Sequence, residues 1–116
     1  MSIKNNFKYH DKDKYEQLLK VSNPQKVIEN AIKYFDNPNI EIYLSTLKNK
    51  KYTIMNLDKM KKVHFGDIRY SDFTKHNDLL RREAYLNRAY NIHGKWMDNK
   101  YSPNNLAIAL LWNGYE

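Results

Sequence analysis

The sequence contains no cysteine and no long apolar segment. The missing cysteine excludes disulfide bonds, thiolate zinc sites and thiol catalysis. The longest apolar run, Leu106 to Trp112, is far shorter than the ~20 residues that a membrane-spanning helix needs. Residues 1–10 are polar and lack a hydrophobic targeting segment. We therefore expect a protein without a membrane span, soluble inside the cell or packed inside a particle.

Arginine is scarce, and its few positions are clustered. The formal net charge of +7 invites a nucleic-acid-binding interpretation. Lysine outnumbers arginine 16 to 4, however, and Lys, Asn, Tyr and Ile are all encoded by A/T-rich codons. A low-GC genome would supply much of this lysine without functional selection. All four arginines nevertheless lie between Arg69 and Arg88, and composition does not explain that clustering.

Helical patterns occupy both ends of the chain. Asn23 can cap a helix whose first turn accommodates Pro24, and apolar residues keep helical spacing as far as Phe35. Ser102 followed by Pro103 predicts the start of the last helix in the same way. The other predicted helices are a weak one over 12–20 and a long one over 72–90, whose core-facing residues are expected to be Phe73, Leu80, Ala84 and Tyr90.

Strand patterns occupy the middle of the chain. Apolar and polar residues alternate over 40–45, and further strands are predicted at 52–55 and 62–65. The short connections favour an antiparallel meander, whose apolar face requires helices against it. The sequence thus predicts an α+β fold: a small three-stranded antiparallel meander flanked by N-terminal and C-terminal helices.

The chain is expected to form a single domain over residues 1–116. It has only three glycines and three prolines, and no internal repeat or Gly/Ser linker interrupts it. Within this domain we expect a helical lead-in over 1–37, followed by the meander and its helices over 38–116.

A long string of distinctive residues runs from Lys62 to Asn113. It comprises Val63-His64-Phe65-Gly66-Asp67, Tyr70, Asp72-Phe73-Thr74-Lys75-His76, Asp78, Arg81-Arg82, Tyr85-Leu86, Arg88, Trp96, Tyr101-Ser102-Pro103, Leu106 and Leu110-Leu111-Trp112-Asn113. In these residues the chain resembles an uncharacterised protein family of large DNA viruses, including giant viruses and some phages. The resemblance covers about residues 38–113. It implies a viral origin and no assigned activity, and a role as a virion component is an expectation by analogy.

Several residues could be drawn as a catalytic or metal site. His64 with Asp67 can be a base and its partner, although a strand ending in an ordinary Gly-Asp turn explains the same residues. In a continuous helix, Asp72 would share a face with His76 and could orient it as a general base. No nucleophile, oxyanion donor or hydrolase motif accompanies them. A metal site built from these histidines with Asp72 and Asp78 lacks the usual Cys/His spacing. We therefore expect no enzyme, no cofactor and no metal.

The arginines and the aromatic tail are stronger candidates for contact with a partner. Arg81 and Arg88 lie seven residues apart on one helix face, and guanidinium groups suit phosphate or carboxylate. The same face can equally be solvated, with arginines paired to Asp78 and Glu83, for example Arg82 to Asp78. Trp112 can be core, a lid over the sheet, or a partner surface. The candidate residues for partner or phosphate contact are Arg69, Lys75, Arg81, Arg82, Arg88 and Trp112.

Three functions compete for this sequence. The first is a non-enzymatic viral structural or assembly protein, a minor virion or capsid-associated component that acts through protein–protein contacts. The alternative is a nucleic-acid-binding protein that binds phosphates with the Arg-bearing helix and with lysines at strand ends and hairpin tips, while Tyr52 or Tyr70 stacks on bases. These hairpin lysines are Lys48, Lys50, Lys51, Lys59, Lys61 and Lys62. A metal-dependent nuclease ranks third, because no acidic metal cluster is evident. The expected partners are other virion proteins, or nucleic acid, in an oligomer or larger assembly, located in the virion or in the viral factory of the host cytoplasm.

Overall fold

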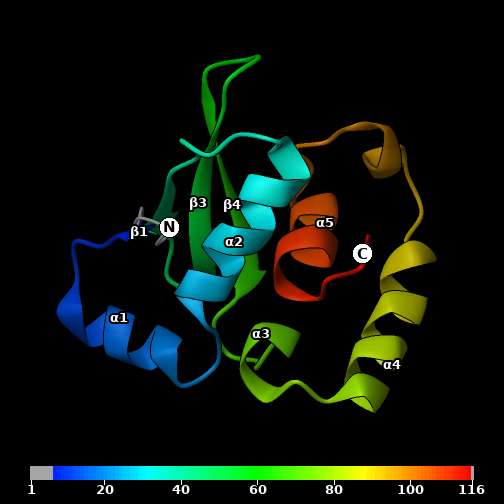
Figure 1. The fold of residues 1–116 in the computed structure, drawn as a ribbon, viewed down its shortest axis with the longest axis horizontal. Helices are drawn as coiled ribbons and strands as arrows, with labels where there is room; N and C mark the ends of the chain where they lie inside the picture. Colours follow the sequence, from blue (N-terminus) through cyan, green and yellow to red (C-terminus); the bar gives the residue numbers. More distant parts are fainter. Residues whose placement is uncertain (1–6, 116) are drawn as a thin grey trace.

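The computed structural model describes residues 7–115, which have the α+β architecture that the sequence predicts (Figure 1). No helix in this range is both long enough and apolar enough to cross a membrane. The strands are β1 (Phe7–Lys8), β2 (Ile42–Leu44), β3 (Lys50–Asn56) and β4 (Lys61–Asp67). The helices are α1 (Lys12–Leu19), α2 (Pro24–Phe35), α3 (Phe73–His76), α4 (Leu79–Tyr90) and α5 (Pro103–Leu106), with a 3-10 turn η1 (Trp96–Asp98) and a π-helical segment η2 (Ala107–Leu111) that continues α5.

The sheet contains the predicted meander and one strand more. Strands β2, β3 and β4 are antiparallel neighbours, as predicted, but β1 adds a fourth strand that runs parallel to β2. The prediction of three antiparallel strands is therefore corrected to a four-stranded mixed sheet. A two-residue strand has no alternation pattern for sequence analysis to detect. Phe7 nevertheless faces the core, where its ring meets that of Tyr52 edge-on at 5.8 Å.

The core lies on one face of the sheet. Helix α2 and the continuous α5–η2 helix lie side by side over this face (Figure 1). The capping residues Asn23 and Ser102 act as predicted, since each side chain accepts a hydrogen bond from the backbone N–H three residues ahead. The buried apolar side chains include Val27 and Ile28 from α2, Tyr52, Ile54 and Phe65 from the sheet, and Leu106, Ala109, Leu110 and Trp112 from the last helix and its end.

The long helix predicted over 72–90 is two helices in the structure. Asn77 adopts a left-handed conformation with φ 55°, which ends α3 after a single turn. Asp78 then caps α4, and its carboxylate accepts from the N–H groups of Leu80 and Arg81. The break rotates α4, so Leu80 is 80% exposed rather than buried. The residues of α4 that turn inward are Tyr85, Leu86 and Ala89, whereas the predicted core residues Ala84 and Tyr90 are exposed.

Candidate functional site

A cleft of about 540 Å³ opens between the end of β4, helix α4 and the last helix. Strand β4 contributes Gly66 and Asp67, and the following loop contributes Tyr70 and Ser71. The opposite walls come from α4 and from η2 with the residue that follows it. Their lining residues are Arg81, Ala84, Tyr85, Arg88, Ala107, Leu111 and Trp112, and Lys51 completes the site from β3.

A buried ion pair underlies the cleft. The Lys51 Nζ donates to Asp72 Oδ2 at 2.9 Å, and the two side chains are only 2% and 1% exposed. Asp72 also caps α3, because its Oδ1 accepts from the backbone N–H and the hydroxyl of Thr74. Burial lowers the pKa of Lys51, and the Asp72 carboxylate opposes that shift. The pair ties β3 to α3 at the point where the chain turns toward α4.

The aromatic wall of the cleft is a stacked pair. The rings of Tyr85 and Trp112 lie 4.2 Å apart and within 8° of parallel. Burial raises the pKa of Tyr85 to about 12, so its hydroxyl stays protonated at neutral pH. Trp112 is 8% exposed. The sequence left open whether it is a core residue, a lid over the sheet or a partner surface, and its burial supports a core residue. The part of Trp112 that remains accessible faces the cleft.

Gly66 permits the close approach of the last helix to the sheet. Its φ is +80°, a conformation that side-chain-bearing residues rarely adopt. A Cβ atom at this position would lie 2.9 Å from the Cδ1 of Leu111 and 3.2 Å from the Cβ of Lys51. Any larger residue would therefore push η2 away from β4 and widen the cleft.

The predicted contact residues separate into two groups. Arg81, Arg88 and Trp112 line the cleft together. Arg69 borders it indirectly, because its guanidinium donates to both carboxylate oxygens of Asp67 at 2.9 and 2.7 Å. These hydrogen bonds lower the pKa of Asp67 to about 2.

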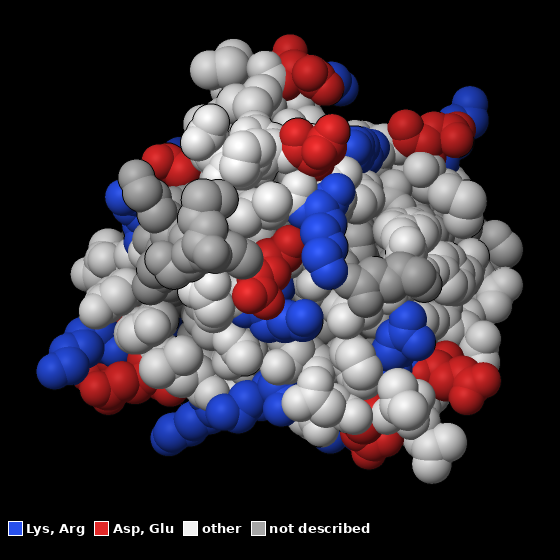
Figure 2. All heavy atoms as spheres, in the orientation of Figure 1, with Lys and Arg blue, Asp and Glu red and all other residues white. Residues whose placement is uncertain are grey.

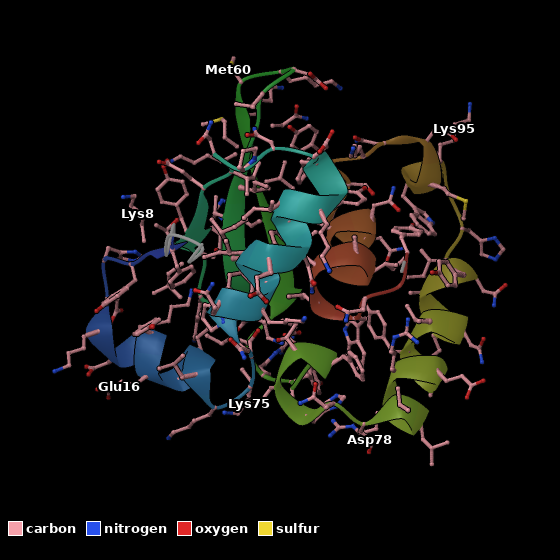
Figure 3. The ribbon with its side chains drawn as sticks, viewed as in Figure 1. Lys8, Glu16, Met60, Lys75, Asp78 and Lys95 are labelled. Carbon is pink, nitrogen blue, oxygen red and sulfur yellow. The ribbon has the colours of Figure 1, made fainter. Side chains whose placement is uncertain are left out.

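The other two predicted residues lie elsewhere. Arg82 is half-buried and donates to the backbone carbonyls of Trp112 and Asn113 at 2.9 and 2.7 Å, so it closes the end of the last helix instead of pairing with Asp78. Lys75 is exposed on α3 and does not line the cleft. Figure 3 places Lys75 and Asp78 along the edge of the molecule where α3 leads into α4.

The cleft is positively charged. Of its lining cations, Lys51 is already paired with Asp72, whereas Arg81 and Arg88 remain; the lining carboxylate of Asp67 is paired with Arg69. Arg81 and Arg88 are exposed, and the described residues supply no carboxylate within ion-pair distance of either guanidinium. Figure 2 shows Lys, Arg, Asp and Glu interspersed on the face it presents, so the charge of +7 is not gathered into one patch there. The cleft can thus accept an anionic group.

The structure separates the residues drawn as a catalytic or metal site. Asp72 binds Lys51 rather than His76, whose Nδ1 accepts from the backbone N–H of Asp78. His64 shares strand β4 with Asp67, but its imidazole hydrogen-bonds the hydroxyls of Ser45 and Thr53 instead. Among residues 7–115, no three His, Asp or Glu side chains gather as a metal ion would require.

The hairpin lysines are spread along the length of β3 and do not gather at one end of it. Lys48 lies in the turn before β3 and Lys59 in the turn after it, which places them about 20 Å apart along the strand. Lys51 and Tyr52 are buried, so neither can contact phosphates or stack on bases as predicted. Tyr70 is exposed and remains available.

The fold should lose stability in mildly acidic solution because of two histidines. Burial lowers the pKa of His76, whose Nε2 is buried and finds no hydrogen-bond partner among residues 7–115, and the Arg81 charge lowers it further. Burial, followed by the charge of Lys62, lowers the pKa of His64. Each histidine therefore binds protons more readily in the unfolded chain. The two neutral histidines should therefore contribute their full stabilisation above the unfolded-state pKa of about 6.5. This contribution is lost as the pH decreases through the lowered pKa values of the folded protein, so the free energy of unfolding should fall.

Urea denaturation at steps from about pH 7 to about pH 5 measures this slope, because most carboxylates titrate below that window. The double variant His64→Asn/His76→Asn should show a flatter dependence than the parent protein. His93→Asn, a change at an exposed histidine, should keep the parent slope. Equal slopes for the double variant and the parent protein would show that His64 and His76 do not cause the loss of stability at acidic pH.

Sequence analysis did not detect Lys51 as part of the site. It was grouped with the hairpin lysines at strand ends, whereas the structure places it inside β3 and under the cleft. Its partner lies 21 residues away along the chain, and no local spacing rule connects such a pair. The one signal was compositional, since a charged residue beside Tyr52 and Ile54 in an apolar strand requires a partner.

Residues 40–89, from just before β2 to near the end of α4, match a protein family described as a family of unknown function (DUF5754). The match includes Lys51, Asp72, Arg81 and Arg88 but not the last helix. No curated protein and no solved structure matches the chain. Over these residues the chain is similar to a family whose function is unknown.

Proposed function

We propose that this chain is a non-enzymatic assembly protein of a large DNA virus, which binds another virion protein through the cleft and the first turn of α4. The viral origin rests on the resemblance over residues 38–113. The protein-binding role rests on one observation: Leu79 and Leu80 are 68% and 80% exposed, side by side with Arg81. Two adjacent exposed leucines next to a hollow are typical of a surface that a partner covers.

The residue types around the cleft support a protein partner. Arginine and aromatic residues are enriched in protein interfaces, whereas lysine is depleted. This chain uses lysine for most of its cations, yet Arg81 and Arg88 line the cleft, and Arg69 lies against the ring of the exposed Tyr70 at 5.9 Å. The surface thus combines exposed leucine, tyrosine and arginine in one region.

The charge of the cleft specifies the chemistry of the partner. Arg81 and Arg88 are separated by about two helical turns, or roughly 10 Å along α4. A carboxylate side chain inserted between them can accept hydrogen bonds from either guanidinium. Apolar residues beside that carboxylate would cover Leu79 and Leu80. The expected partner segment therefore carries Asp or Glu next to apolar side chains.

Site-specific photo-crosslinking in cells infected with the source virus tests this proposal. A photoreactive phenylalanine analogue at Leu80 should cross-link to one virion protein, and mass spectrometry should locate the cross-link in an acidic segment. The same analogue at the exposed Met97 is the matched control. Adding Arg88→Glu should abolish the Leu80 cross-link while the circular dichroism spectrum stays unchanged. Cross-links that are identical from both positions, or insensitive to Arg88→Glu, would refute the proposed surface.

A further inference from the structure

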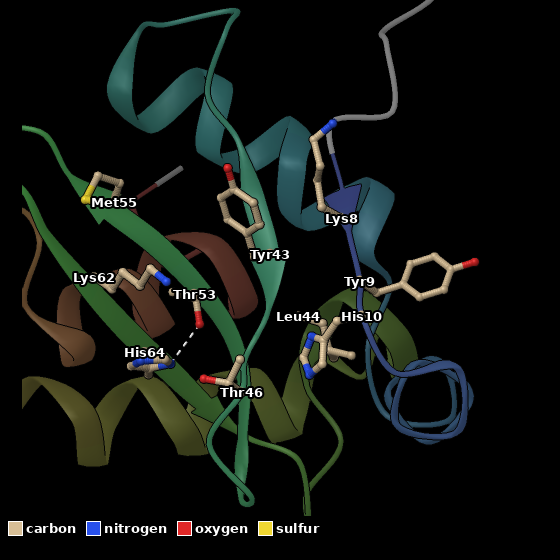
Figure 4. Close-up of a pocket in the computed structure, with 10 residues that line it drawn as sticks. All are labelled: Lys8, Tyr9, His10, Tyr43, Leu44, Thr46, Thr53, Met55, Lys62 and His64. Carbon is tan, nitrogen blue, oxygen red and sulfur yellow. Dashed lines mark hydrogen bonds between the residues drawn. The ribbon is translucent and has the colours of Figure 1, made fainter.

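The face of the sheet opposite the core carries a row of polar and aromatic side chains. Strand pairing aligns Lys8 with Tyr43, Tyr43 with Thr53, and Thr53 with His64, so one row crosses all four strands. Adjacent strands are about 4.8 Å apart, which makes the row roughly 14 Å long. A hollow of about 440 Å³ lies over it, also lined by Lys62. Figure 4 shows these side chains on this face.

Two buried hydroxyls hold the imidazole of His64 in place. Its Nδ1 lies 2.8 Å from the Oγ of Ser45 and 2.7 Å from the Oγ1 of Thr53. Both hydroxyls are buried, and the Ser45 Oγ also accepts from the N–H of Leu47. Ser45 thus orients the ring and is not exposed as a nucleophile. The other ring nitrogen, Nε2, is left for contact with a ligand in the hollow.

The surroundings of His64 are cationic. Besides burial, the groups that lower its pKa are Lys62, Lys14 and Lys50, and no carboxylate of the described part of the chain offsets them. Lys62 and Lys8 both line the hollow. These lysine charges disfavour protonation of the imidazole and favour the binding of an anion above it.

A tyrosine ring beside these cations is fixed in orientation. The Tyr43 hydroxyl donates to the Glu41 carboxylate at 2.6 Å, and the Tyr43 side chain is exposed on the sheet. Tyr9 also lines the hollow, and its ring stacks on Tyr15 at 4.1 Å. Met55 adds apolar surface next to Tyr43. Cations, a fixed aromatic ring and an apolar hollow of this size match a phosphate joined to a flat base.

We propose that this open face of the sheet binds single-stranded nucleic acid, with a base on Tyr43, the Nε2 of His64 in contact with the same nucleotide, and phosphates near Lys8 and Lys62. A single strand fits because its bases can leave the stack and lie on a tyrosine ring, whereas the base faces of a duplex are covered. This site is separate from the cleft beside α4, so it neither requires nor excludes the protein-binding role.

Fluorescence anisotropy with labelled dT12 and rU12 tests the proposal on the full chain. At about 50 mM salt we expect binding that weakens as salt rises. Tyr43→Leu should weaken binding about tenfold, because stacking contributes about 1–3 kcal/mol per base. Lys62→Gln should weaken it and reduce the log–log salt slope by about 0.7, the value of one phosphate contact on a single strand. Circular dichroism should confirm that both variants are folded.

Matched controls decide between this face and the rest of the basic surface. Tyr70→Leu changes an exposed tyrosine of the α4 cleft, and Lys95→Gln removes an equally exposed charge; both should bind like the parent protein. Absence of binding, or equal losses in Tyr70→Leu and Tyr43→Leu, would overturn the proposal. The proposal would also be overturned if thymidine monophosphate bound as tightly as dT12, or if a glutamate peptide competed as well as unlabelled dT12. Neither of these ligands offers several bases linked by phosphates. If the photo-crosslinking from Leu80 fails while dT12 still binds, only the proposed protein-binding surface is refuted, and the nucleic-acid site on the sheet is not.

Discussion

Lys51→Met should lower the free energy of unfolding by about 3–5 kcal/mol, the usual range when one member of a buried ion pair is removed. The substitution keeps the aliphatic volume inside β3 but leaves the carboxylate of Asp72, 1% exposed, without its cation. The hydrogen bonds from Thr74 remain, yet they do not neutralise the charge. Urea denaturation followed by circular dichroism measures the loss.

Two further variants separate the ion pair from a general effect of the substitution. Lys50→Met removes the same charge from the neighbouring exposed residue and should change stability by less than about 0.5 kcal/mol. The double variant Lys51→Met/Asp72→Asn removes both charges while the Asn oxygen can still accept from the Thr74 N–H. It should recover a large part of the loss, because no charge is left buried without a partner. A Lys51→Met variant as stable as Lys50→Met would show that Asp72 does not depend on Lys51.

The elements that sequence analysis predicted well have strong local signals. Helix α2 begins where Asn23 and Pro24 place it, and α5 begins at Pro103 after its Ser102 cap. Capping needs only the residues within one turn, so it is readable without the rest of the fold. The β2–β4 meander is equally local, since short turns join consecutive strands. The parallel strand β1 has no such signal, because the helices α1 and α2 separate it from β2.

The residues that sequence analysis placed incorrectly depend on contacts between distant segments. Over 72–90 the helical spacing runs on past Asn77 and Asp78, two residue types that can end one helix and cap the next but that also occur inside helices. In the fold, α3 is tied to β3 through Asp72, while Arg82 of α4 reaches the carbonyls of Trp112 and Asn113. Two separate anchors of this kind favour two short helices over one long helix.

The candidate cleft was predictable in part. The spacing of Arg81 and Arg88 places both guanidiniums on one side of α4, and the structure brings both to the same cleft. What the spacing cannot supply is the opposite wall, because Gly66, Leu111 and Trp112 approach α4 only after the last helix packs on the sheet. A solvated arginine face and a lined cleft are therefore indistinguishable before the fold is known.

Trp112→Ala should destabilise the fold by about 3–5 kcal/mol, as large-to-small substitutions of buried aromatic residues do. The indole is 8% exposed, stacks on Tyr85 at 4.2 Å and lies 5.3 Å from His76. Its removal leaves a cavity between α3, α4 and the last helix. A residue that served only as a surface anchor for a partner would instead leave the unfolding free energy of the isolated chain nearly unchanged.

Trp112→Phe is the matched control, because a smaller ring can still stack on Tyr85 and fill most of the space. It should cost distinctly less than Trp112→Ala, and the difference reports the volume that the indole fills. Urea midpoints and unfolding slopes of both variants, measured on the purified chain without any partner, provide the comparison. If Trp112→Ala unfolds at the same urea concentration as the parent protein, the tryptophan does not support the fold, and its role would have to lie in contacts with another molecule.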